Sequence, residues 1–221
     1  MKSLRLSPST LTLFLECPKC FWLQLKMNIH RPSGPFPSLP GGMDILIKKY
    51  FDAYRLRGAV PPEIKDIDAQ LFADIEILNK WRNWRTGLAY TDEETGAVLS
   101  GAVDDCLVKD SFFIPMDYKT RGFDVKEGGE SFYQNQMNCY SLLLEKNGMR
   151  QPNYAWLVYW IPKEISPGGM VRFNVVLKKV VTNPEDALKT FRRAVALLDG
   201  PMPASHSACT FCSWGGEFLT D

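Results

Sequence analysis

Two Cys-x-x-C pairs lie near opposite ends of this 221-residue chain, Cys17 and Cys20 in CPKC and Cys209 and Cys212 in CTFC. In a reducing compartment this pattern is typical of one four-thiolate metal site rather than of disulfide bonds. Four cysteines can hold either a [4Fe–4S] cluster or Zn²⁺, and their spacing in the sequence does not decide between the two. A shared site closes a loop of nearly the whole chain, so the fold must bring both ends together.

The composition is that of a folded protein without a strong overall charge. Hydrophobic residues make up 45% of the chain, and its length fits a single domain over residues 1–221. The formal net charge is +1, so a nucleic-acid ligand would have to be held by a local basic patch. No apolar run is long enough to span a membrane and no signal peptide is recognisable, so we expect a soluble, cytoplasmic protein.

Hydrophobic periodicity predicts a core of the α/β or α+β class. The order along the chain is helices, three strands, a helix, two strands and a helix. Prolines and glycines in RPSGPFPSLPGG predict a loop over residues 31–42. We expect helices over residues 8–16, 43–58, 130–148 and 183–200, a three-strand meander over 87–91, 97–108 and 112–120, and strands over 154–162 and 171–182.

An acid and a base follow each other in the third predicted strand, FFIPMDYKT, where Asp117 and Lys119 share a face. A two-residue turn at Asp110-Ser111 would place Asp104, in the preceding strand, opposite Asp117. Two neighbouring carboxylates repel unless a divalent cation joins them, and oxygen ligands suit Mg²⁺ or Mn²⁺. Lys119 can then orient or deprotonate a water molecule. The alternative is an exposed hairpin with ordinary surface ion pairs.

Two further groups of polar and aromatic residues are candidates for the same site. Gln136 and Tyr140 share one face of the predicted helix, where an amide and a phenol can contact a phosphate near the metal; the alternative is a buried tyrosine and a surface glutamine. The aromatic and basic residues of WRNWR can stack on DNA or steer it, or can be a core-facing aromatic pair with exposed arginines. These residues are Trp81, Arg82, Trp84 and Arg85.

The blocks GAVDD, MDYKT and QMNCY, in that order, resemble the RecB-like branch of the PD-(D/E)xK nuclease superfamily, which includes CRISPR-associated iron–sulfur exonucleases. The opening LSPSTLTLFLECPKCFWL is also similar to this branch. The resemblance implies an α/β fold with a restriction-endonuclease-like core, in which helices flank a mixed central sheet. It also implies metal-dependent hydrolysis of DNA, by an exonuclease or an enzyme acting on ends or single strands. It also implies a setting in DNA repair, recombination or CRISPR-type defence, with protein partners in such a complex.

By position, the resemblance implies a role for each residue of these blocks. Asp104, Asp117 and the backbone carbonyl of Tyr118 would bind the catalytic metal, Lys119 would be catalytic, and Gln136 and Tyr140 would support the site.

The chain departs from that branch at two places. Where the branch usually carries a metal-binding histidine, GGMDILIKKYFD offers Asp44, which can bind the same metal; alternatively it is a helix N-terminal acid favoured by the helix dipole. Iron–sulfur members use one N-terminal and three C-terminal cysteines, whereas this chain has two and two. The resemblance nevertheless favours [4Fe–4S] over Zn²⁺.

Two other functions remain open from the sequence. One is a catalytically inactive nucleic-acid-binding module that has kept the nuclease fold. The other is a metal-stabilised protein-interaction domain without a nucleic-acid ligand.

Overall fold

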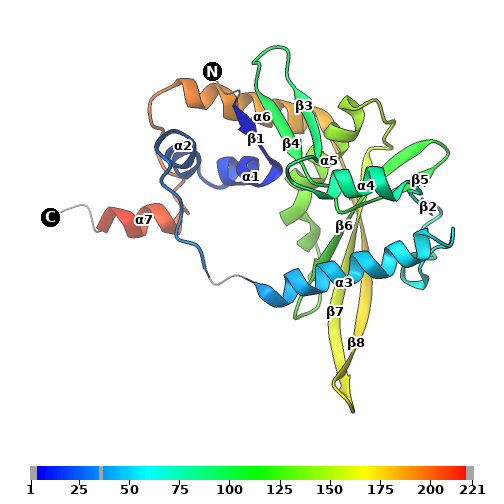
Figure 1. Ribbon diagram of the computed structural model, residues 1–221. Coiled ribbons are helices and arrows are strands. Elements are labelled where there is room, and N and C mark those ends of the chain that lie inside the picture. Colours follow the sequence, from blue (N-terminus) through cyan, green and yellow to red (C-terminus); the bar gives the residue numbers. More distant parts are fainter. Residues whose placement is uncertain (1–3, 35–36, 218–221) are drawn as a thin grey trace.

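The computed structural model describes residues 4–34 and 37–217 (Figure 1). Within these residues, helices surround a five-stranded sheet and a second sheet of three strands. The elements in chain order are β1 (Arg5–Leu6), α1 (Pro8–Glu16), α2 (Pro18–Met27), α3 (Ser38–Arg55), the 3₁₀ turn η1 (Pro62–Ile64), β2 (Gln70–Leu71), α4 (Ile75–Arg82), β3 (Leu88–Thr91), β4 (Val98–Gly101), β5 (Asp105–Lys109), β6 (Phe112–Thr120), the 3₁₀ turn η2 (Gly129–Tyr133), α5 (Gln134–Lys146), β7 (Tyr154–Ser166), β8 (Met170–Val181), α6 (Pro184–Asp199) and α7 (Thr210–Glu217).

The larger sheet has the strand order β2-β5-β6-β7-β8. Strands β6 and β7 are parallel and are connected through α5, whereas the other neighbouring pairs are antiparallel. The predicted mixed sheet flanked by helices is therefore confirmed. In Figure 1, β7 and β8 extend as a long hairpin away from the rest of the molecule.

Helices cover both faces of the larger sheet, and β6 contributes side chains to each face in turn. Met116 and Tyr118 pack against Phe51 of α3. Asp117 and Lys119 point to the opposite face, where they contact Gln136 of α5. This alternation follows from the two-residue period of a strand, and it directs the acid and the lysine to the same side.

The predicted three-strand meander is wrong in one respect. The segment 97–108 is divided into β4 and β5, and β4 pairs with β3 and β1 in the smaller sheet. The chain leaves the ladder at residues 102–104, where the Val103 amide donates to the carbonyl of Trp81 at 3.1 Å. A contact with α4 thus interrupts a run that reads as a continuous strand.

The predicted loop over residues 31–42 is also too long, because α3 already begins at Ser38. Pro40 is the third residue of the helix, where amide groups have no partner within the helix and a proline is tolerated. Gly41 then donates to the carbonyl of Pro37 at 3.2 Å.

A buried ion cluster joins α3, α4 and the central sheet on the face opposite Lys119. Asp105 is fully buried and accepts from Arg55 at 2.6 and 2.7 Å, from Arg82 at 2.9 Å and from the Tyr118 hydroxyl at 2.6 Å. Although Asp105 is next to Asp104 in the sequence, these contacts give it a structural role.

Asp105→Asn is expected to lower the free energy of unfolding by about 3–5 kcal/mol, because two arginines would lose their buried counter-charge. Urea unfolding measures this change. Asp68→Asn is the matched control, since the Asp68–Lys109 pair is exposed and such pairs contribute about 0–1 kcal/mol. Equal losses for the two variants would contradict the structural role of Asp105.

Candidate nuclease site

A tight hairpin between β5 and β6 brings two carboxylates together. Asp110 and Ser111 form the two-residue turn, both with positive φ, and Asp105 pairs with Met116. The ladder ends there, and Asp104, the residue before it, lies close enough to Asp117 for the two carboxylates to interact, as the sequence predicts. The Tyr118 amide donates to Asp104 Oδ2 at 3.4 Å, which holds this carboxylate beside the strand that carries Asp117.

Asp117 is 1% exposed, and its two oxygens have different surroundings. Oδ1 accepts from Gln136 Nε2 at 2.9 Å. Oδ2 lies against the ammonium group of Lys119 but accepts no hydrogen bond of regular geometry from the described residues. Burial and then the charge of Asp104 raise the pKa of Asp117 to about 7, although Lys119 acts in the opposite direction. A buried carboxylate oxygen without a regular hydrogen bond, next to a second carboxylate, is a suitable ligand for a divalent cation.

Gln136 connects Lys119, Asp117 and Tyr140. Its Oε1 accepts from Lys119 Nζ at 3.1 Å, and its amide nitrogen donates to Asp117 and to the Tyr140 hydroxyl at 2.7 Å. Burial, and secondarily the charge of Asp117, raises the pKa of Tyr140 well above its usual value, so the phenol remains protonated. The Lys119 ammonium also lies over the ring of Tyr133, 4.4 Å from its centroid. The structure therefore brings together the lysine, both strand acids and both helix residues predicted from the sequence.

Lys48, a residue that sequence analysis missed, connects Asp44 to this group through Asp104. Lys48 Nζ donates to Asp44 Oδ2 at 2.8 Å and to Asp104 Oδ1 at 2.7 Å. Burial lowers the pKa of Lys48, but the charges of Asp104 and Asp44 outweigh it and raise the pKa, so the ammonium stays charged. The spacing of Lys48 four residues after Asp44 was a usable signal, since such residues share a helix face.

The location of Asp44 rules out the alternative reading of it as a helix N-terminal acid. Helix α3 begins at Ser38, and its first turn contains no acid. Tyr118 points its side chain to the opposite face, where its hydroxyl bonds to Asp105. Only its backbone is on the side of the carboxylates, through the amide contact with Asp104.

The aromatic and basic residues at the end of α4 and just after it are divided between core and surface. Trp81 is buried and stacks on Phe72, while Arg82 binds Asp105 and donates to the carbonyl of Asp104 at 2.7 Å. Trp84 is 71% exposed, and the guanidinium of Arg85 lies 4.7 Å from its ring centroid. The reading of a core-facing aromatic pair with exposed arginines is therefore wrong for Trp84 and Arg82.

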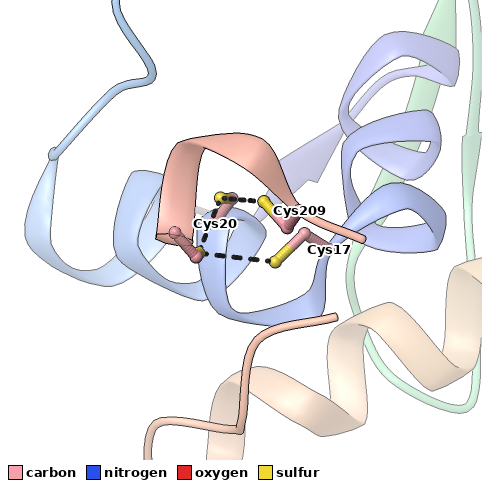
Figure 2. A group of neighbouring side chains, drawn as sticks. Cys17, Cys20 and Cys209 are labelled. Carbon is pink, nitrogen blue, oxygen red and sulfur yellow. Dashed lines mark hydrogen bonds between the residues drawn. The ribbon is translucent and has the colours of Figure 1, made fainter. Parts of the chain in front are cut away.

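The four cysteines of the two Cys-x-x-C pairs form a second site between α2 and α7 (Figure 2). Cys17 caps α2 and Cys20 lies in its first turn, with Pro18 at the first helical position. Cys209 and Cys212 are placed in the same way at the start of α7, which lies beside α2 in Figure 1. Each pair thus presents its thiols at a helix N-terminus, and the two chain ends meet there as predicted.

The distances between these sulfur atoms test which metal group the site fits. They are 3.7 Å for Cys17–Cys212, 3.6 Å for Cys20–Cys209 and 3.5 Å for Cys20–Cys212, and all four sulfurs lie within 4.8 Å of one another. A single tetrahedral zinc with Zn–S bonds of about 2.3 Å places its sulfurs about 3.8 Å apart. A [4Fe–4S] cluster sets an iron behind each cysteine around a core of sulfides, which requires wider spacing. The thiol geometry fits one metal ion.

Arg31 supplies a positive charge beside the thiols. Its Nη2 donates to Cys209 Sγ at 3.8 Å, its Nη1 pairs with Glu16 at 2.5 Å, and its guanidinium lies 4.6 Å from the Phe211 ring centroid. Four thiolates around a divalent ion carry two excess negative charges, and Arg31 places a positive charge beside them that it shares with Glu16.

None of the described helices is long and apolar enough to cross a membrane.

Comparison with known proteins places the chain in a family. No curated protein matches the sequence. The family profile described as PD-(D/E)XK nuclease superfamily matches residues 47–216, a region that includes Lys48, Asp104, Asp117, Lys119, Gln136 and Tyr140. Since this match covers most of the chain, the protein belongs to the PD-(D/E)XK nuclease superfamily.

Proposed function

We propose that this protein is a Mg²⁺- or Mn²⁺-dependent deoxyribonuclease that hydrolyses phosphodiester bonds at the site formed by Asp104, Asp117 and Lys119. The observation that carries the proposal is the buried carboxylate of Asp117, beside a second carboxylate and in contact with a lysine on the same face. Carboxylates that share a buried site are stable together when a cation neutralises them.

Asp104, Asp117 and the backbone carbonyl of Tyr118 would hold the ion, with Asp44 as a further oxygen ligand. The bound ion supplies a Lewis acid for the phosphate and lowers the pKa of a water molecule. Lys119 orients the attacking water and stabilises the negative charge that develops on the phosphate. Gln136 fixes the position of Lys119 by accepting from it, and Tyr140 in turn fixes Gln136.

Lys48 changes the net charge next to the proposed metal site. Lys48 and Asp44 together carry no net charge, and a neutral histidine at the position of Asp44 would likewise carry none. The Lys48 ammonium also donates a hydrogen bond to Asp104 Oδ1, so a divalent ion must compete with Lys48 for that oxygen.

Lys48→Met is therefore expected to strengthen Mn²⁺ binding by roughly 10-fold or more, because it removes a positive charge beside the site, and two unit charges about 4 Å apart interact by about 4 kcal/mol at an effective dielectric constant of about 20. Titration of free Mn²⁺ by electron paramagnetic resonance measures the affinity without any turnover. Lys49→Met, at the exposed neighbouring residue, is the matched control. Unchanged or weaker Mn²⁺ binding by Lys48→Met would contradict the competition.

Without added Mg²⁺ or Mn²⁺, stability is expected to fall as the pH rises from about 4 to about 7. The pKa of Asp117 is about 7 in the folded protein and about 4 in an unfolded chain, so the folded state holds the extra proton in this window. The contribution is fully present below about pH 4 and is lost as the pH passes the folded pKa. Urea unfolding across this range measures it, and Asp117→Asn should flatten the dependence. The same slope in both proteins would show that Asp117 is not its source.

The order of the three sequence blocks supports an assignment to one branch of the superfamily. We place the chain in the RecB-like, CRISPR-associated branch, as a single domain over residues 1–221 acting as an exonuclease or on ends and single strands of DNA. Its setting would be repair, recombination or CRISPR-type defence in the cytoplasm, alongside protein partners. For the cysteine site, the sulfur distances favour one Zn²⁺ over the [4Fe–4S] cluster that the resemblance implies.

A cleavage assay on single-stranded and duplex DNA and on RNA of matched sequence tests the proposal, with Mg²⁺, Mn²⁺ or EDTA. Cleavage of DNA that requires the metal and is lost in Asp117→Asn is the expected result. If the protein binds DNA but cleaves none of these substrates, it is instead an inactive module that has kept the nuclease fold. Absence of any binding at low salt would favour a protein-interaction domain.

A further inference from the structure

A groove of about 1010 Å³ opens beside the proposed catalytic residues. It is lined by β1 and the first turns of α1, by the segment after α4, by the end of β4 and by the residues that lead into α5. Gln136 and Tyr140 form part of its wall, and so does Tyr133, whose ring lies under the Lys119 ammonium. The groove therefore reaches two residues that contact the lysine, Tyr133 and Gln136. Its volume is at the upper end of the range of about 300–1,000 Å³ for ligand pockets, which suits a polymer segment.

The charged side chains that line this groove are all basic. Arg5 and Arg85 are both exposed, and neither forms an ion pair with an acid among the residues that the structure describes. No aspartate or glutamate is among the lining residues. This local charge suits a polyanion, although the net charge of the whole chain is close to zero.

Two large aromatic rings in the groove are unusually exposed. Phe132 is 82% exposed and Trp84 is 71% exposed, and they come from different elements, η2 and the segment after α4. Arg85 stacks on the Trp84 ring and extends the flat surface. Exposed rings next to arginines that have no acidic partner are the combination that binds unpaired bases by stacking and the backbone by charge. A duplex cannot use these rings, because its bases are already stacked within the helix.

We propose that this groove binds a single-stranded nucleic acid, with bases stacked on Trp84 and Phe132 and phosphates near Arg5 and Arg85, and leads the strand to Lys119. The statement that the strand leads to a catalytic lysine rests on the proposed nuclease function, but strand binding is measurable without cleavage.

Fluorescence anisotropy with a labelled single strand of about 12 nucleotides, in EDTA-free buffer containing Ca²⁺ in place of Mg²⁺, tests the groove. Trp84→Ala and Phe132→Ala should each weaken binding by about 5- to 150-fold, the effect of losing one base-stacking contact. Arg5→Ala combined with Arg85→Ala should reduce the slope of log affinity against log salt by about 1.4, as expected for two phosphate contacts on a single strand. Arg57→Ala, which removes an exposed arginine stacked on Tyr54 at the end of α3, is the matched control and should bind as the wild type does.

A small diester separates this proposal from the nuclease function. Bis(4-nitrophenyl) phosphate needs the catalytic groups but no groove, so the groove variants should hydrolyse it at the wild-type rate while Asp117→Asn should not. Strand binding that depends on Trp84 and Phe132 in a protein that cleaves nothing would support the groove and overturn the nuclease function. Wild-type strand affinity in the groove variants, or duplex binding that is equally tight and equally sensitive to them, would overturn the groove.

Discussion

Replacement of Lys119 by alanine is expected to lower DNA cleavage by about 10³-fold, the usual effect of removing a group that stabilises charge or moves a proton at the reacting centre. Lys119 is 16% exposed and contacts Asp117, Gln136 and the ring of Tyr133. These contacts fix its ammonium beside the proposed metal ligands. Strand binding, measured by anisotropy with Ca²⁺, should be retained within a few-fold because the groove residues are unchanged.

The chain contains its own control for this experiment. Lys126 follows Asp124 with the same Asp-x-Lys spacing, but both are exposed and Asp124 pairs with Lys163 across the surface. Lys126→Ala should cleave DNA as fast as the wild type. Equal rates for Lys119→Ala and the wild type, with cleavage by both, would show that the chemistry occurs elsewhere.

Replacement of Cys17 or Cys212 by serine is expected to release the bound metal and to reduce the yield of folded protein severely. A structural zinc contributes about 10–16 kcal/mol in small zinc-binding domains, which equals or exceeds the about 5–15 kcal/mol of net stability of a typical domain. The site also joins α2 to α7, so its loss frees both ends of the chain. Metal content by mass spectrometry and the thermal unfolding midpoint measure the two effects.

Cys139 provides the matched control, because it is buried in the main core and lies outside the thiol cluster. Cys139→Ala should keep the full metal content and lose only a small amount of packing. Wild-type protein should contain one zinc per chain and no absorption band near about 400 nm, where cysteine-bound iron–sulfur clusters absorb. Iron, sulfide and such a band would contradict the zinc assignment, and full metal content in Cys17→Ser would contradict the four-cysteine site.

The sequence predicted the acidic pair well because its geometry is local. The register of β5 and β6 depends on the turn at Asp110-Ser111, and strand alternation then sets the face of Asp117 and Lys119. To place Gln136 in the site, one must also know that α5 packs against that face of the sheet. The resemblance of the three sequence blocks provided this information.

What the sequence did not reveal depends on contacts between distant elements. Lys48 reaches Asp104 from α3, 56 positions earlier in the chain, and periodicity carries no sign of that contact. Asp105 and Arg82 look like site residues by position, yet the burial of Asp105 between α3 and α4 makes them a structural cluster. The sulfur distances are likewise a property of how α2 and α7 meet, which the Cys-x-x-C spacing does not determine.

The central claim is that the carboxylates of Asp104 and Asp117 bind a divalent cation beside Lys119. Anomalous scattering from Mn²⁺ in crystals of the zinc-loaded protein tests this claim most directly. The predicted result is a Mn²⁺ peak within about 2.5 Å of an oxygen from each of these two carboxylates, with Lys48 displaced from Asp104. A fully Mn²⁺-soaked crystal in which this position has no anomalous peak, and in which Lys48 still bridges Asp44 and Asp104, would contradict it.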